Sequence, residues 1–180
     1  NNSFGFESFC QGPTFSLDPG FFNSPIEITI ESSEGEYSIY YTLDGSNPST
    51  SSNLYLEPID ITQTAVLRAS MIDPNCLSSE ISTSSYFINE DMNLPIISLT
   101  TDPDNFWDWE TGIYVMGPNA SYNMPHFGAN FWEDWERPIY IEFFESDGDL
   151  GFAQDAGVKI FGGWSRANPQ KSLSIFARAS

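Results

Sequence analysis

Two glycines and two cations near the end of the chain are the densest group of residues that could bind an anion. Gly162 and Gly163 are followed by Arg166 and Lys171. A glycine pair lets the backbone approach a ligand closely, and backbone N–H groups in such a turn can form an anion site. An arginine fork and a lysine ammonium both suit phosphate. The same glycines can simply form the bend of a β-hairpin, so a phosphate site and a plain turn both remain open.

The distribution of charge singles out the same stretch. The chain has 25 acidic residues and 6 Lys+Arg, a net charge of -19. Every acid lies in residues 1–155, whereas residues 156–180 hold four cations and no acid. A positive end on an acidic body indicates an anion site or a surface that pairs with acidic sequence elsewhere. On the charges alone, a strand pair exposing a few basic side chains is the simpler explanation.

The acidic surface also limits the partners. It repels nucleic acid and anionic membranes. No apolar run approaches the roughly 20 residues that a membrane span needs. We therefore expect no nucleic-acid partner and no membrane insertion.

No complete catalytic set is evident. The single histidine, His126, has no nucleophile-elbow sequence to serve, and a packing or surface role explains it. Carboxylates are too common for any pair to indicate a glycosidase. Asp102, Asp104 and Asp108 lack the glycine and glutamate pattern of a calcium loop, and helix capping explains Asp102 better. We predict no catalytic residue and no metal site in this chain.

The tryptophans lie in the second half of the chain. Trp132 and Trp135 occur in a loop-like stretch, and such rings are good platforms for sugars or partner proteins. Packing in the core of a small irregular domain explains them as well. The five tryptophans are Trp107, Trp109, Trp132, Trp135 and Trp164.

Cys10 and Cys76 are too far apart in sequence for a metal motif. Both lie in loop-like sequence beside strands. In an acidic, lysine-poor chain of extracellular character this favours a disulfide. Two separate buried thiols are the alternative.

Residues 13–88 contain short segments with the two-residue alternation of half-buried strands. They are separated by turn signals such as Asp44-Gly45 and contain no convincing helical period. This spacing predicts an all-β sandwich. The expected strands cover residues 26–31, 37–43, 54–61, 65–72 and 81–88.

A polar segment at residues 89–95 ends in Pro95 and predicts a division into domains at 1–90 and 91–180. Beyond it we expect a helical turn at residues 103–109 and a long loop at residues 117–134. The chain stops just after a strand, so we expect the second domain to be incomplete at Ser180. The expected strands of this part cover residues 95–100, 112–116, 137–145, 158–161 and 172–178.

The end of the chain resembles the spore-coat CotH kinase family. The matching motifs are Gly-Gly-Trp-Ser-Arg at residues 162–166 and Pro-Gln-Lys-Ser-Leu at residues 169–173, with support from residues 94–108, 112–115 and 130–138. The resemblance covers about residues 94–178. It implies an atypical extracellular kinase-like fold that binds ATP and Mg²⁺ and phosphorylates secreted proteins. By analogy Lys171 is the phosphate-binding lysine and Arg166 an auxiliary anion contact, while the metal-binding and base aspartates are expected beyond Ser180.

Residues 13–88 resemble the small β-sandwich appended to chitobiase and β-hexosaminidase enzymes. The resemblance is carried by residues 13–17, 20–22, 40–48, 58–59 and 66–69. It implies an immunoglobulin- or fibronectin-III-like module that acts as a spacer or accessory domain. In such sandwiches the first strand starts near the loop joining the last two, which implies that Cys10 lies close to Cys76.

Together these observations predict a mainly β protein, an Ig- or fibronectin-III-like sandwich followed by a partial, β-rich, CotH-type kinase-like domain. The expected function is that of the N-terminal portion of a secreted or cell-surface bacterial CotH-like protein. The fragment itself would be inactive, with ATP and Mg²⁺ needed only by a full-length kinase. The alternative is an extracellular carbohydrate-binding or adhesion module that uses the Trp-rich loop to bind a surface glycan. A hydrolase lacking its catalytic half is a weaker third hypothesis.

Overall fold

The computed structural model describes residues 11–32, 38–72 and 79–177, which form two compact units. The first comprises the described residues within Asn1–Ile96 together with Phe144–Gly151, and the second those within Ile97–Phe143 and Phe152–Ser180. The sequence placed the division between residues 90 and 91. The observed division by contacts lies at residues 96 and 97, and it assigns the turn around residue 148 to the first unit.

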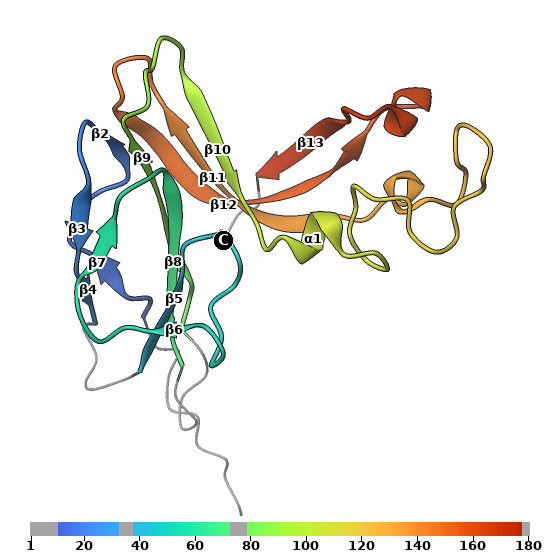
Figure 1. The fold of residues 1–180 in the computed structure, drawn as a ribbon. Helices are drawn as coiled ribbons and strands as arrows, with labels where there is room; N and C mark the ends of the chain where they lie inside the picture. The colour runs from blue at the N-terminus through green and yellow to red at the C-terminus, as the bar shows by residue number, and fades with distance from the viewer. Residues whose placement is uncertain (1–10, 33–37, 73–78, 178–180) are drawn as a thin grey trace, which may run out of the picture. The chain divides into compact units, whose positions relative to one another are not determined.

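The first unit is built from short strands in several sheets (Figure 1). In the largest sheet β2 pairs with β9 in parallel, and β9, β8, β5 and β6 follow one another as antiparallel neighbours. These strands are β2 (Gly20–Phe22), β9 (Ser82–Ile88), β8 (Ala65–Met71), β5 (Ile39–Thr42) and β6 (Asn53–Leu54). Two strand pairs complete the unit: β1 (Thr14–Phe15) with β4 (Ile30–Glu31), and β3 (Ile26–Ile28) with β7 (Ile59–Ile61).

One hydrophobic core lies between these sheets. Alternate side chains of β3 and β7, such as Ile28 and Ile61, meet alternate side chains of β8, such as Leu67 and Met71. Burial of one face of each strand is what the two-residue alternation of the sequence encodes. Tyr86 is fully buried, and its hydroxyl donates to the carbonyl oxygen of Leu17 at 2.8 Å. The mainly β fold predicted from the sequence is confirmed, and its sheets share a core as in a sandwich.

The other face of β8 is also buried, which the alternation did not indicate. Arg68 lies on that face and is only 9% exposed. Its guanidinium donates to the carbonyl oxygen of Gly45 at 2.9 Å, to Asn47 Oδ1 at 2.7 Å and to Thr83 Oγ1 at 3.3 Å. A buried guanidinium must be matched by acceptors, and here they come from the loop after β5. Arg68 therefore fixes that loop against the sheet.

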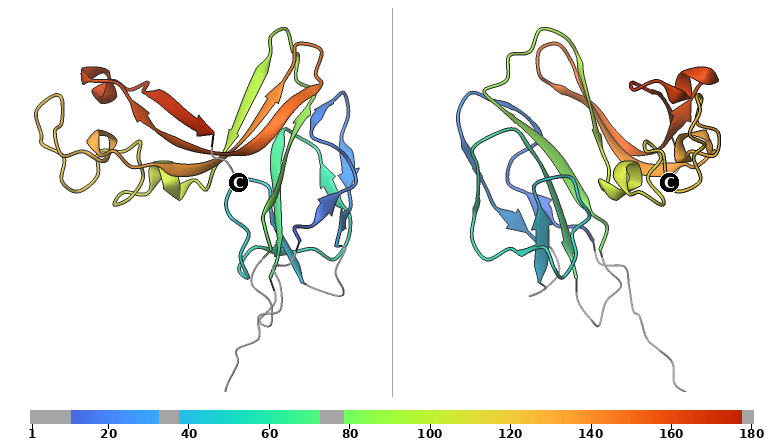
Figure 2. Two further views of the ribbon diagram at one scale, coloured as in Figure 1. Left: turned by 180° about the vertical axis from the view of Figure 1, so that it is seen from behind. Right: turned by 45° about the vertical axis from the view of Figure 1, so that its right-hand side comes forward.

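The second unit contains a four-stranded sheet in the order β10-β11-β12-β13, seen from two further sides in Figure 2. The strands are β10 (Ile96–Thr100), β11 (Arg137–Phe144), β12 (Leu150–Phe161) and β13 (Ser172–Ala177). Three short helical segments are α1 (Asp104–Trp107) and the 3₁₀ turns η1 (Asn130–Trp132) and η2 (Trp164–Ala167). Its core combines sheet residues such as Ile141 and Val158 with Ile113 and Phe131 from the loops.

The strand expected at residues 112–116 is wrong. The backbone N–H of Gly112 donates to the carbonyl oxygen of Asp108, Ile113 to that of Asn105, and Tyr114 to that of Phe106. These bonds tie the segment back onto α1, so its backbone groups do not join the sheet ladder.

Three further expected strands differ from the structure. The run at residues 26–31 is divided between β3, which pairs with β7, and β4, which pairs with β1. The run at residues 54–61 is divided between β6 and β7, which pair with different strands. β12 begins at Leu150 instead of residue 158. The start of β12 was missed because residues 150–157 include two glycines and lack a run of β-branched residues. Gly157 lies against the Glu136 side chain, which would have to move if a Cβ were added there.

The short helix α1 begins at Asp104 with Pro103 as its N-cap, one residue later than the sequence suggested. Asp102 Oδ1 accepts a hydrogen bond from the backbone N–H of Asp104 at 3.0 Å, and Pro103 lies between them. An acidic side chain just before a helix can in this way accept a hydrogen bond from a first-turn N–H that has no partner inside the helix.

Cys10 and Cys76 lie outside the described residues, so their disulfide stays a prediction.

Within the described ranges, no helix is both long and apolar enough to cross a lipid bilayer.

The long loop at residues 117–134 is anchored by Asn130, which is only 2% exposed. Its side-chain amide donates to the carbonyl oxygens of Trp109 at 3.2 Å and Gly112 at 3.1 Å. Gly117, with φ of 70°, leaves the room that this side chain occupies, because a Cβ there would lie 1.9 Å from Asn130 Oδ1. Asn130 thus joins its own loop to the segment at residues 109–112 through two hydrogen bonds.

Replacing Asn130 with Ala is expected to lower the free energy of unfolding by about 1–3 kcal/mol, because the carbonyl oxygens of Gly112 and Trp109 lose their donor and the first of these bonds is buried. Urea unfolding followed by tryptophan fluorescence measures this. Asn119→Ala is the matched control, an exposed asparagine in the same loop. Equal stability losses in the two variants would contradict the anchoring role of Asn130.

Candidate functional site

The connection between β12 and β13 contains the predicted anion-binding residues. Phe161 and Ser172 are register partners at the end of this antiparallel pair, so residues 162–171 form the hairpin connection. Gly162 has φ of 121°, and a Cβ there would lie 2.4 Å from Ser165 Oγ. Gly163 has open space where a Cβ would project. Gly162 therefore makes the turn, and Gly163 leaves the backbone exposed.

Arg166 holds this turn together from η2. Its Nε donates to the carbonyl oxygen of Gly162 at 2.7 Å, and one terminal nitrogen donates to the carbonyl oxygen of Trp132 at 3.2 Å. A guanidinium has five N–H groups, so donors remain for an anion. The geometry gives Arg166 a positioning role, and its predicted anion contact stays a prediction.

Lys171 sits immediately before β13 on two aromatic rings. Its ammonium nitrogen lies 4.1 Å from the ring centre of Phe131 and 5.3 Å from that of Tyr114. The same nitrogen donates to the carbonyl oxygen of Asn168 at 2.8 Å. The Lys171 backbone N–H donates to the Tyr114 hydroxyl at 2.9 Å, and that hydroxyl reaches the carbonyl oxygen of Pro169 at 3.3 Å. The aromatic rings and carbonyls thus fix both the backbone and the head group of Lys171.

The two lysines of the chain differ in their electrostatic surroundings. Lys159 forms a 2.7 Å ion pair with Asp134, and this hydrogen bond lowers the pKa of the Asp134 carboxyl. Among the described residues Lys171 forms no salt bridge. Partial burial lowers the pKa of its ammonium. Lys171 is thus a half-buried cation without a carboxylate partner in the described part of the chain.

The sequence did not indicate the rings that support Lys171. Tyr114 precedes it by 57 positions and belongs to the segment wrongly expected to be a strand. Phe131 comes from η1, inside the stretch expected to be a loop. Only the folding of these loops onto the sheet brings them to Lys171.

The structure separates the two candidate tryptophans. Trp132 contacts Phe127, with ring centres 5.2 Å apart, and its indole N–H donates to the carbonyl oxygen of Pro125 at 2.8 Å. Phe127 also meets Trp164 edge to face at 6.3 Å, and Trp164 is 71% exposed. Trp135 lies elsewhere, beneath the guanidinium of Arg137 at 5.3 Å. We call Phe127, Trp132 and Trp164 the aromatic trio.

The remaining polar candidates have local structural roles. His126 Nδ1 lies 3.0 Å from the carbonyl oxygen of Ser121 within its own loop. Asp108 accepts hydrogen bonds from the hydroxyl and the N–H of Thr111, which lower the pKa of its carboxyl. Across residues 11–32, 38–72 and 79–177, no three His, Cys, Asp or Glu side chains are grouped as a metal site would require.

Replacing Tyr114 with Phe is expected to lower the free energy of unfolding by about 0.5–1.5 kcal/mol, because Lys171 N–H loses its acceptor. The exchange rate of that amide with solvent should rise, as hydrogen-exchange NMR would measure. Tyr122→Phe is the control, since Tyr122 is 96% exposed. Unchanged protection of the Lys171 amide in Tyr114→Phe would contradict the assigned bond.

The comparisons with known proteins bear on the first unit. Residues 17–83 match the family model of the chitobiase/beta-hexosaminidase C-terminal domain. No curated protein matches the chain. The segment from β3 to β8 lies wholly within the match, so the sandwich of the first unit is similar to the chitobiase/beta-hexosaminidase C-terminal domain.

Proposed function

We propose that this chain is the N-terminal portion of a secreted or cell-surface CotH-like protein. In this proposal the sandwich is a spacer or accessory module, and the second unit is part of a kinase-like domain. The metal-binding and base aspartates would lie beyond Ser180, so phosphoryl transfer to a secreted protein substrate belongs to a longer protein. The observation that carries the proposal is the environment of Lys171, within the motif that resembles the family.

Lys171 suits a phosphate contact for two reasons. Its ammonium group donates one hydrogen bond among the described residues, to the carbonyl oxygen of Asn168, which leaves donors for phosphate oxygens. It also lacks a carboxylate partner among the described residues, so a phosphate would not have to displace one. A half-buried ammonium gains more from an anion than an exposed one, because water screens the pair less.

The backbone around Gly162 and Gly163 suits the same role. Gly163 is exposed with open space beside its Cα, which allows phosphate oxygens to approach. ATP would meet Lys171 and this backbone, while Arg166 keeps the turn closed. Bound Mg²⁺ would neutralise phosphate charge. The described residues offer no cluster of ligands for Mg²⁺, so this chain supports only the phosphate contact.

In the longer protein, Lys171→Ala is expected to weaken ATP binding in the presence of Mg²⁺ by about tenfold or more, since a charge-assisted hydrogen bond is lost. The thermal shift produced by ATP and isothermal titration calorimetry would measure this. Lys159→Ala is the matched control, because it removes the other lysine, which is already paired with Asp134.

Two results would contradict this assignment. One is the absence of any Mg²⁺-dependent thermal shift with ATP in the longer protein. The other is an equal loss of affinity in Lys159→Ala and Lys171→Ala, which would indicate a general effect of net charge.

The aromatic trio favours a second candidate, an adhesion function in which the second unit binds a surface glycan. Phe127 is 57% and Trp164 71% exposed, and Trp132 is held by its bond to Pro125. Exposed rings fixed in place stack well on the apolar faces of sugars. Trp135, occupied by Arg137, contributes less to such a platform.

Trp164→Ala is expected to reduce binding to a glycan array by about fivefold or more if the trio is the platform. Trp109→Ala provides the control, because Trp109 is 58% exposed but lies outside the trio. An array signal that persists in Trp164→Ala and falls in Trp109→Ala would contradict this second function.

A further inference from the structure

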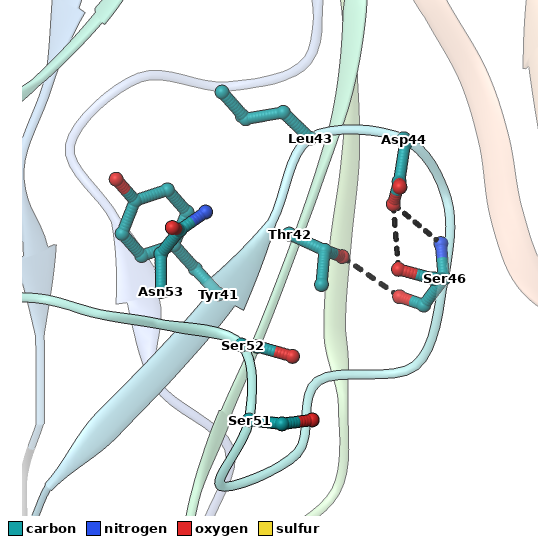
Figure 3. A pocket seen from close by; sticks show the side chains of 8 residues that line it. All are labelled: Tyr41, Thr42, Leu43, Asp44, Ser46, Ser51, Ser52 and Asn53. Carbon is teal, nitrogen blue, oxygen red and sulfur yellow. Dashed lines mark hydrogen bonds between the residues drawn. The ribbon is translucent and has the colours of Figure 1, made fainter.

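The sandwich contains an open polar hollow of about 430 Å³ at the end of β5, distinct from the Lys171 region and from the aromatic trio. Figure 3 shows its rim. Asp44 and Ser46 lie at one side, Tyr41 and Asn53 at the other, and Ser52 on the loop that returns to β6. Its volume falls within the about 300–1,000 Å³ typical of small-ligand sites.

One side of the hollow is held rigidly. Thr42 Oγ1 donates to the carbonyl oxygen of Ser46 at 2.7 Å, and Asp44 Oδ1 accepts from both the N–H and the hydroxyl of Ser46 at 3.1 and 2.6 Å. These bonds lower the pKa of the Asp44 carboxyl, so it is ionised at neutral pH. The buried Arg68 fixes the next residue, Gly45, through its carbonyl oxygen. The loop is therefore shaped before any ligand arrives.

The opposite side pairs an aromatic ring with an amide. Tyr41 on β5 and Asn53 on β6 are direct cross-strand partners, which places their side chains on the same face of the sheet. Tyr41 packs against the sandwich core, so its ring is fixed. Asn53 is exposed, and its amide makes no side-chain hydrogen bond with another described residue.

Several groups at the hollow thus have hydrogen-bond donors or acceptors that remain available to a ligand. Both hydrogen bonds that Asp44 accepts from Ser46 go to Oδ1, which leaves Oδ2 as an acceptor. The Asn53 amide offers two donors and an acceptor. A fixed ring with an amide beside it, and a carboxylate across from both, match the apolar face and the hydroxyl pairs of a pyranose.

We propose that this hollow binds a neutral saccharide, with Asp44 and Asn53 bonding ring hydroxyls and Tyr41 supporting the ring face. The negative charge at the hollow favours a neutral ligand. The Asp44 carboxylate at the hollow repels phosphorylated, sulfated or carboxylated ligands. The serine-rich wall offers little to an apolar ligand. The proposal does not depend on the CotH-like function, because no residue of the hollow lies in the second unit.

The test is saturation-transfer NMR of the whole chain with neutral trisaccharides of glucose, mannose, galactose and N-acetylglucosamine. We expect transfer to at least one of them, with a dissociation constant on the order of millimolar for an open site. The double variant Asp44→Asn/Asn53→Ala should weaken binding by about fivefold or more. Asn at position 44 keeps an acceptor for Ser46, so the loop should persist. Asp60→Asn, an exposed acid on β7, is the control and should bind like the parent chain.

Amide shift mapping on the parent chain makes the test independent of any folding defect in the variants. Shifts on saccharide addition at residues 41–53 support the proposal. It is overturned if none of the four saccharides binds, or if the shifts fall at residues 122–164 and Trp164→Ala abolishes binding. It is also overturned if Asp60→Asn weakens binding as much as the double variant. Loss of ATP binding in Lys171→Ala would leave each of these outcomes unchanged.

Discussion

The fold depends on how its loops satisfy their backbone carbonyl groups. Much of the second unit and the loop after β5 lie outside regular ladders, and a carbonyl buried there without a donor would be costly. The chain has only 6 Lys+Arg against 25 acids, yet most of the described cations bond to carbonyls rather than to carboxylates. Each fixes a loop where it approaches a sheet or turn. The bonds are Arg68 to Gly45, Arg137 to Thr111, Arg166 to Gly162 and Lys171 to Asn168.

The sequence predicted those parts of the fold in which local pattern and tertiary packing agree. Strands such as β8 and β9 were located because one face alternates into the sandwich core. Prediction failed where distant groups decide the backbone. Residues 112–116 read as a strand, but their N–H groups bond to carbonyls around α1. The start of β12 was missed because residues 150–157 include two glycines and lack a run of β-branched residues, although Gly157 packs against the Glu136 side chain.

Prediction of the candidate sites from the sequence was incomplete for the same reason, because distant residues complete them. Motif spacing identified Lys171 and its glycines, because the residues lie close together in the chain. It did not identify Phe131 and Tyr114, which reach the ammonium only through loop packing. The sandwich hollow was not foreseen, since the pairing of Tyr41 with Asn53 follows from strand register across a loop. Register is set by the whole sheet, and no short motif encodes it.

The uneven placement of tryptophan makes the two units optically distinct. All five indoles belong to the second unit, and the sandwich has only tyrosine and phenylalanine. Emission excited at the red edge of tryptophan absorption therefore reports on the second unit alone. Far-ultraviolet circular dichroism reports on the strands of both. Comparing the two signals during denaturation would tell whether the units unfold together or in separate steps, without labels or cleavage of the chain.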